Sequence, residues 1–285
     1  MDAQVIFLVF LASQTFLLSW HLPKLIQARM RYVFDHYSFE QYPKLYGGDE
    51  EKSHKNYRRH VAFNNVMVVV GIGLIIALAV YGENLSSGQK SMVAFLYGMV
   101  QAIPLILMDL LLLKQCKQLN AENTAPQRTA SLTRRSLFNH TSMSMIAAVV
   151  SFYLIAMLFD MYTKSFDTSL GFELYESVVI LTAVNLFFAW MIRWRVYGKK
   201  LNPLLSEEDN MKEINAVVSS SLYISIAVSI FFMTMRAVNV YDLEQFEGVL
   251  MSAYMQSIFL LSVIHSLKQL PIEKMNMDKF RASSN

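Results

Sequence analysis

The stretch that decides the fold is Met92–Leu113, MVAFLYGMVQAIPLILMDLLLL. It is long enough to cross a bilayer, because about 20 apolar residues span the hydrocarbon core. The run nevertheless contains Gln101, Pro104 and Asp109. A carboxylate inside a membrane costs roughly 2.5–3.5 kcal/mol on insertion scales. We therefore expect Asp109 to be buried between helices, beside a partner that offsets this cost.

The composition indicates an integral, multi-pass membrane protein of the cell or inner membrane. Of 285 residues, 54% are hydrophobic and 16% are charged, whereas an ordinary soluble domain has about 25% charged residues. The net charge of +3 does not indicate nucleic-acid binding, because the basic residues lie next to apolar runs. The single cysteine, Cys116, cannot form an internal disulfide.

Further apolar runs of membrane length predict an all-α bundle of seven transmembrane helices, forming one integral membrane domain over 1–285. The expected spans lie near 4–22, 61–82, 92–113, 142–163, 176–196, 215–237 and 248–267.

The distribution of basic residues predicts the direction of these spans. Lysines and arginines gather in 23–60, 114–141, 197–214 and the C-terminal tail, while the other connections hold almost none. Because positive loops stay in the cytoplasm, we expect the N-terminus outside and the C-terminus in the cytoplasm.

The segment 23–60 mixes aromatic and charged residues and does not resemble a span. We consider two structures for its first part: a helix that lies along the cytoplasmic interface, or a continuation of the first helix. Its surface is a possible docking site for a protein partner. The small polar residues of 117–133 predict a loop.

Spans two to seven have the pattern of three helical hairpins. Asn64, Asn139 and Asn215 follow basic or polar lead-ins at nearly equal intervals, which favours an internal repeat. The alternative is that asparagine simply caps helix starts. Gly71 and Gly73 in the second span indicate close helix packing.

A layer of polar residues is expected roughly 10 Å to the cytoplasmic side of mid-membrane, counting about 1.5 Å per residue. It contains Asn65, Asp109, Arg193, Ser219 and His265. Asp109 and Arg193 are the natural ion pair, with His265 as the alternative partner. The layer is either the floor of a solute- or ion-binding cavity or a set of ties between helices.

A second set lies near mid-membrane and contains Gln14, Gln101, Asn185 and Gln256. Amide side chains at this depth form hydrogen bonds between helices or a substrate site. On the outer side, Asp160 and Arg236 lie at comparable depth, and we expect them to pair as a tether.

Catalytic and phosphate-binding motifs, metal-ligand spacings and cofactor signatures are absent from the sequence, so it does not indicate an enzyme, a cofactor or a metal site. The first hypothesis is a transporter or channel for a small solute or ion. The alternative is a non-catalytic membrane subunit, assembly factor or sensor that binds a protein partner. A third hypothesis, an intramembrane enzyme, rests only on Asp109, His140 and His265.

Overall fold

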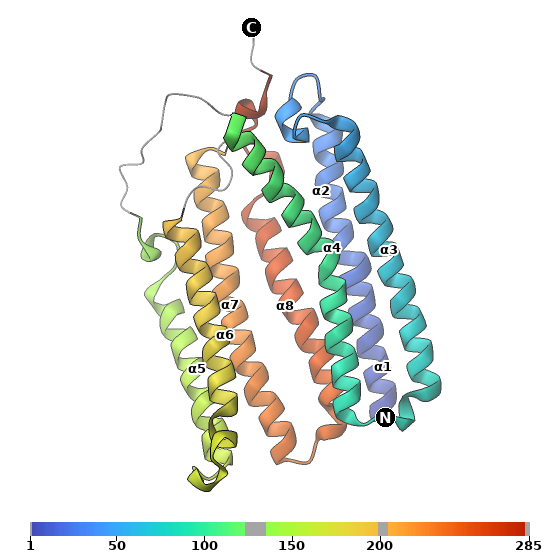
Figure 1. The fold of residues 1–285 in the computed structure, drawn as a ribbon, viewed down its shortest axis with the longest axis vertical. Helices are drawn as coiled ribbons and strands as arrows, with labels where there is room; N and C mark the ends of the chain where they lie inside the picture. The colour runs from blue at the N-terminus through green and yellow to red at the C-terminus, as the bar shows by residue number, and fades with distance from the viewer. Residues whose placement is uncertain (1, 123–134, 199–204, 283–285) are drawn as a thin grey trace.

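A computed structural model describes residues 2–122, 135–198 and 205–282. Seven of its helices are long and apolar enough to span a membrane, as predicted (Figure 1). They are the continuous helix Ala3–His36, α3 (Glu50–Tyr81), α4 (Ser87–Glu122), α5 (Met143–Thr163), α6 (Phe172–Tyr197), α7 (Glu207–Val240) and α8 (Glu247–Gln269). Short 3₁₀ turns precede or follow several of them: η2 (Pro43–Tyr46), η3 (Gly82–Asn84), η4 (Leu137–Asn139), η5 (Thr168–Leu170), η6 (Glu244–Phe246), η7 (Ile272–Lys274) and η8 (Asp278–Phe280).

The first span is one helix built from α1 (Ala3–Gln14), a π-helical segment η1 (Thr15–His21) and α2 (Leu22–His36). In η1 the hydrogen bonds reach five residues back, as from the Leu22 N–H to the Leu17 carbonyl. Pro23 follows directly and has no N–H to donate. The π-helical turns lie just before this proline, and α1, η1 and α2 form one continuous helix through it. Of the two structures considered for the residues after 22, the chain has the continuation of the first helix (Figure 1).

Segment 23–60 is a helical hairpin made of α2, η2 and the first turns of α3. The ring of Phe34 on α2 packs on His54 of α3 at 4.4 Å and on Tyr46 of η2 at 5.7 Å. The C-terminal tail then covers part of this hairpin. Met277 and Phe280 are buried against neighbouring side chains, and the Ala282 N–H donates to the Gln41 carbonyl at 2.9 Å. The residues packed on this pair are Tyr37, Tyr42, Leu45, Ile272 and Met275.

Several helices extend beyond the spans expected from the sequence. Helix α3 begins at Glu50 rather than near 61, because Asp49 caps it by accepting from the Lys52 N–H. Helix α4 continues to Glu122 and so includes the start of the expected 117–133 loop. Residues 123–133 of that loop lie outside the described residues.

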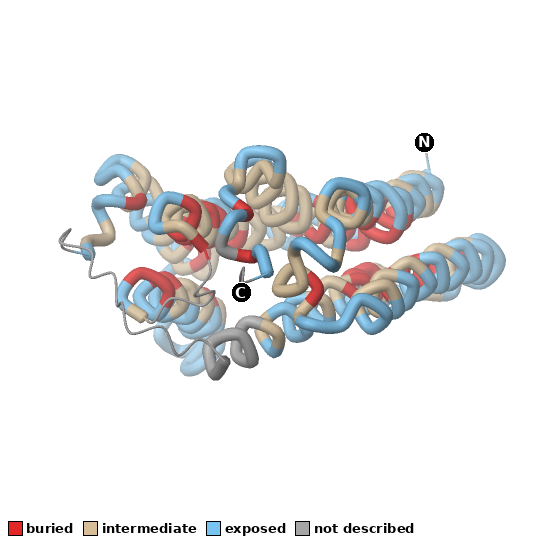
Figure 2. The backbone as a smooth tube through the Cα atoms, turned by 90° about the horizontal axis from the view of Figure 1, so that it is seen from above, coloured by how far each residue is buried: buried red, intermediate tan, exposed pale blue. Residues whose placement is uncertain are grey.

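The helices form two packed groups with α8 between them (Figure 1), and Figure 2 shows that buried and exposed residues alternate along the helices. In the first group Phe7 and Leu11 of α1 are buried against Leu78, Ala94, Tyr97 and Val249, from α3, α4 and α8. In the second group α5, α6 and α7 share two clusters of buried side chains. These clusters contain Ala156, Leu181, Ile192, Val196, Ile214, Val218, Leu222 and Val228.

Gly71 allows α3 to approach the first span and α4 closely, as the sequence predicted. A Cβ atom at this position would lie 2.1 Å from the Tyr97 hydroxyl and 2.5 Å from the Thr15 Cγ2. Gly73 does not share this role, because a Cβ there would meet no atom within 4 Å. Since helical residues two positions apart point to nearly opposite sides, only one of the two glycines can lie at this contact.

Candidate functional site

A cavity with a volume of about 420 Å³ lies between α5, α6 and α7, at the end of the bundle that we expect to face outward. It is formed where α5 ends, α6 begins and α7 ends. Its polar lining is unusual for an apolar bundle, because five of its side chains are charged. They are Asp160, Lys164, Glu173, Glu176 and Arg236, accompanied by Ser177 and Asn239.

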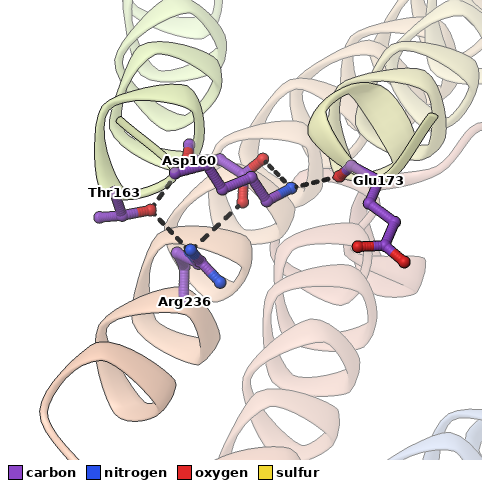
Figure 3. A network of polar contacts seen from close by, with 5 residues as sticks. Asp160, Thr163, Glu173 and Arg236 are labelled. Atoms are coloured by element: carbon purple, nitrogen blue, oxygen red, sulfur yellow. Dashed lines mark hydrogen bonds and ion pairs between the residues drawn. The ribbon is translucent and has the colours of Figure 1, made fainter. Parts of the chain in front are cut away.

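Asp160 is the centre of the charged cluster (Figure 3). Its Oδ2 lies 2.9 Å from Lys164 Nζ, and its Oδ1 lies 3.7 Å from Arg236 Nε. Asp160 is 7% exposed, so two basic partners offset the cost of placing its carboxylate there. The predicted pairing of Asp160 with Arg236 is confirmed, and Lys164 joins it as a second partner.

Hydrogen bonds fix this cluster to three helices. The Thr163 hydroxyl donates to the Asp160 carbonyl at 2.8 Å and accepts from Arg236 Nε at 2.6 Å, which connects α5 with α7. Lys164 Nζ also donates to the Glu173 carbonyl at 2.8 Å, which connects α5 with the start of α6. A network of hydrogen bonds and ion pairs, rather than one isolated ion pair, therefore connects the three helix ends around the cavity.

The α5–α6 connection brings these ends together through a sharp turn. Ser165 and Phe166 have φ angles of 55° and 52°, in the left-handed region that non-glycine residues seldom adopt. Asp167 then caps the 3₁₀ turn η5. It accepts hydrogen bonds from the Ser169 hydroxyl and N–H, which lowers the pKa of the Asp167 carboxyl.

Several polar groups of the lining have no partner within the described parts of the chain. Arg236 bonds to Thr163 through Nε, and neither of its Nη groups makes a hydrogen bond with the described residues. The carboxylates of Glu173 and Glu176 make neither a hydrogen bond nor an ion pair there. The cavity thus presents a free guanidinium end and two free carboxylates.

Of the predicted mid-membrane set, the structure brings Gln14, Gln101 and Gln256 together from α1, α4 and α8. Gln14 Nε2 donates to Gln101 Oε1 at 3.0 Å, and Gln101 Nε2 donates to the Ser19 hydroxyl at 2.8 Å. The Ser252 hydroxyl donates to Gln14 Oε1 at 2.7 Å, and Gln256 Nε2 donates to the Phe10 carbonyl at 3.1 Å. We call these residues, with Ser13, the amide network.

The amide network is saturated. Each of its three amide nitrogens makes two donations; the second ones reach the Ala94 carbonyl, the Gln14 carbonyl and the Ser252 hydroxyl. Gln14 and Gln101 are almost fully buried. Such an arrangement ties helices together and leaves no amide nitrogen free for a solute. Asn185 lies elsewhere, on α6, where the Ser225 hydroxyl of α7 donates to its Oδ1.

The expected cytoplasmic-side layer does not assemble. Asp109 and Arg193 are exposed rather than buried, and the predicted ion pair between them is wrong. Across the described chain Asp109 has no hydrogen-bond or ion-pair partner, and the Arg193 guanidinium lies 5.8 Å from the Tyr197 ring. Asn65 is also exposed, while His265 packs edge-on against Tyr223 at 5.6 Å.

Helix phase explains two of these errors. The buried arginine of α6 is Arg195, whose Nη2 lies 2.7 Å from Glu213 Oε1 of α7. The buried asparagine of α3 is Asn64, which donates to the His60 carbonyl at 2.7 Å. A shift of one or two positions turns a helical side chain by about 100–200°, so a depth estimate alone selects the wrong neighbour.

On helix α4, Asp109 is turned by about 80° around the helix axis from Gln101 and by about 140° from Pro104, both of which are buried. Ala94, Tyr97, Gln101 and Pro104 are buried on one face of this helix. The helix changes direction about halfway along (Figure 1), and Pro104 lies inside it, which permits such a bend. Beyond this bend the same face is uncovered, and Leu112 on it is 51% exposed.

Among the described residues, no group of three or more His, Cys, Asp or Glu side chains is arranged to hold a metal ion. His140 bonds to Asn215 Oδ1 at 2.6 Å rather than meeting His265. The charged cavity brings several free binding groups together, and the sequence did not predict it because depth along a helix does not show which helix ends adjoin. No protein-family model, curated protein or solved structure matches this chain.

Proposed function

We propose that this membrane protein transports a small polar solute, which it binds in the charged cavity between α5, α6 and α7. The observation that carries the proposal is the cavity itself: about 420 Å³ with charged side chains of both signs. Small-molecule sites commonly measure about 300–1,000 Å³ and orient their ligands by a few placed polar groups. A purely structural ion-pair cluster has no need of such a space.

The location of the cavity supports an uptake role. It opens beside the ends of three spanning helices, on the side that the loop charges assign to the exterior. On the opposite side, the uncovered face of α4 beyond Pro104 provides a polar position, Asp109, within reach of the cytoplasmic boundary. A carboxylate there is suited to binding a coupling ion or proton.

Transport is tested with the full chain in proteoliposomes. We expect concentration-dependent uptake of at least one class in a panel of labelled neutral, anionic, cationic and zwitterionic small solutes. Arg236→Gln should reduce this uptake at least tenfold, because it removes a free charge from the cavity. The matched control is Glu83→Gln, which changes an exposed charge near the same end of the bundle but outside the cavity.

The transport proposal is contradicted if folded protein takes up no class of the panel above protein-free vesicles. It is equally contradicted if Arg236→Gln and Glu83→Gln reduce uptake to the same extent.

A second function, as a subunit that binds a protein partner, is favoured by a different observation. Asp109 lies on an exposed, apolar face of α4 without a partner in the residues that the structure describes. A transmembrane segment carrying a basic or hydrogen-bond-donating side chain would cover this face and pair with the carboxylate. The other expected docking surface, segment 23–60, is partly covered by the chain's own tail.

A further inference from the structure

We propose that the charged cavity selects small zwitterions, molecules that carry both a carboxylate and an ammonium group. This inference rests on the same cavity as the proposed transport function and names its ligand class. The argument comes from where the free positive and free negative groups of the lining lie.

Arg236 provides the subsite for the carboxylate. Its Nε is occupied by the Thr163 hydroxyl at 2.6 Å, which holds the guanidinium in place. The Nη groups make no hydrogen bond with the described chain, and Figure 3 shows the guanidinium end turned away from Thr163. A guanidinium with two free N–H-bearing nitrogens matches a carboxylate or another planar anion.

Asp160 does not cancel this positive charge. Its carboxylate is shared between Lys164, at 2.9 Å, and Arg236, at 3.7 Å. Two basic groups and one acid leave the cluster one positive charge in excess. Because Lys164 forms the shorter contact, Arg236 is the group better able to accept a second anion.

Glu173 and Glu176 provide the subsite for the ammonium group. Both line the cavity from the first turns of α6, and residues three apart lie on one side of a helix. Lys164 Nζ bonds to the backbone carbonyl of Glu173 rather than to its carboxylate, so the two charges are not paired through their side chains. The two carboxylates therefore form a negative region separate from the Arg236 end.

A ligand with a single charge satisfies only half of this lining. An anion at Arg236 would also experience the repulsion of Glu173 and Glu176, and a cation at the glutamates would be repelled by the Arg236 cluster. A zwitterion places opposite charges at both ends and adds no net charge to the site. This charge complementarity favours a zwitterion over a ligand that carries only the negative or only the positive group.

The inference is tested by binding to the full chain in nanodiscs, measured by calorimetric titration. The probes are glycine, β-alanine, γ-aminobutyrate and 5-aminovalerate, which vary the distance between the two charges. Acetate and methylammonium are the single-charge comparisons. We expect at least one zwitterion to bind with a Kd at least tenfold lower than both single-charge probes.

Two variants assign the charges to the two subsites. Arg236→Gln and the double change Glu173→Gln with Glu176→Gln should each weaken binding of the best zwitterion at least tenfold, while Glu83→Gln leaves it unchanged. The double variant is informative even if Arg236→Gln unfolds the protein, because both glutamates are exposed and neither side chain makes a hydrogen bond or ion pair with the described residues.

Equal affinity for a zwitterion and for acetate or methylammonium would overturn the inference, as would a lack of zwitterion binding by folded protein. These results differ from a failure of the transport proposal. Zwitterion binding without uptake contradicts the transport proposal and supports the ligand class. Uptake of only neutral or singly charged solutes supports transport and contradicts the ligand class.

Discussion

Gln14 and Gln101 bond to each other twice across the interface of the first span and α4. Gln14 Nε2 donates to Gln101 Oε1 at 3.0 Å, and Gln101 Nε2 donates to the Gln14 carbonyl at 3.4 Å. That carbonyl belongs to the residue before the π-helical segment η1. The irregular helix and the amide of α4 therefore form one structural unit in the middle of the bundle.

Replacing Gln101 with leucine should destabilise the protein by about 1–3 kcal/mol. The change removes the bonds of Gln101 and leaves Gln14 Nε2 and the Ser19 hydroxyl buried with fewer partners; single interhelical bonds in membranes contribute roughly 0.6–1.7 kcal/mol. Equilibrium unfolding in detergent measures the effect. Asn65→Leu is the control, because Asn65 is polar, lies on a spanning helix and is exposed, and it should be neutral or stabilising. Equal losses in the two variants would contradict the assigned role of the network.

Gly71→Ala should destabilise the protein by about 1–3 kcal/mol, the usual range for overpacking. Its Cβ would meet the Tyr97 hydroxyl and Thr15 at distances that require the helices to separate. Gly73→Ala places the same methyl group two positions away, in open space, and should leave the melting temperature unchanged or slightly raised. A comparable loss in both variants would contradict the packing role of Gly71, because the gain in helix propensity from glycine to alanine is stabilising at both positions.

Glu213→Gln should destabilise the protein because it leaves Arg195, which is 5% exposed, without its ionic partner. Breaking a buried pair costs roughly 3–5 kcal/mol, and the loss here should be smaller because the Glu213 side chain is 25% exposed. Glu208→Gln breaks the exposed pair with Lys212, so its effect should be about 0–1 kcal/mol. Urea or detergent unfolding that ranks the two variants in the opposite order would contradict this account.

Labelling with an impermeant thiol reagent tests the predicted orientation. In a Cys116→Ser background, single cysteines at Ser87 and Ser169 should react from outside intact cells, and one at Lys55 should react only after permeabilisation. The reason is that Lys55 lies in a positively charged connection, which the positive-inside rule retains in the cytoplasm. Reaction of the Lys55 cysteine in intact cells would reverse the orientation, and the charged cavity would then face the cytoplasm.

The sequence was sufficient for the helices, because each span is an apolar run of the length that a bilayer imposes. It was also sufficient for the close contact at Gly71 and for the pairing of Asp160 with Arg236. These features depend on local composition or on depth along a helix, which can be counted from the sequence.

The remaining features depend on helix rotation and helix neighbours, which no count along the chain provides. Arg193 and Arg195 lie at almost the same depth, but only Arg195 faces α7. The cavity needs the ends of α5, α6 and α7 to adjoin. The sequence does not show that Lys164, Glu173 and Arg236 lie close together. The signal that could have indicated these residues is their position as charges at the ends of apolar runs.

Asp109→Leu should leave the isolated protein at least as stable as the parent, which is the reverse of what burial in an ion pair would produce. An unpaired carboxylate on an exposed face of α4 contributes no bond to lose, and its removal avoids a cost of up to roughly 2.5–3.5 kcal/mol in the bilayer. Asp160→Leu is the contrasting variant. It removes the partner of Lys164 and Arg236 and should be clearly destabilising. Unfolding in bilayer-like nanodiscs compares the two.

The same Asp109 variants distinguish the two functions. If Asp109 binds a coupling ion, Asp109→Asn should abolish ion-coupled uptake while leaving solute binding in the outer cavity intact. If it pairs with a partner helix, Asp109→Asn should leave uptake unchanged, and Asp109→Leu should weaken co-purification of that partner. A loss of stability in Asp109→Leu as large as in Asp160→Leu would contradict both, because it would mean that Asp109 has an internal partner in the membrane.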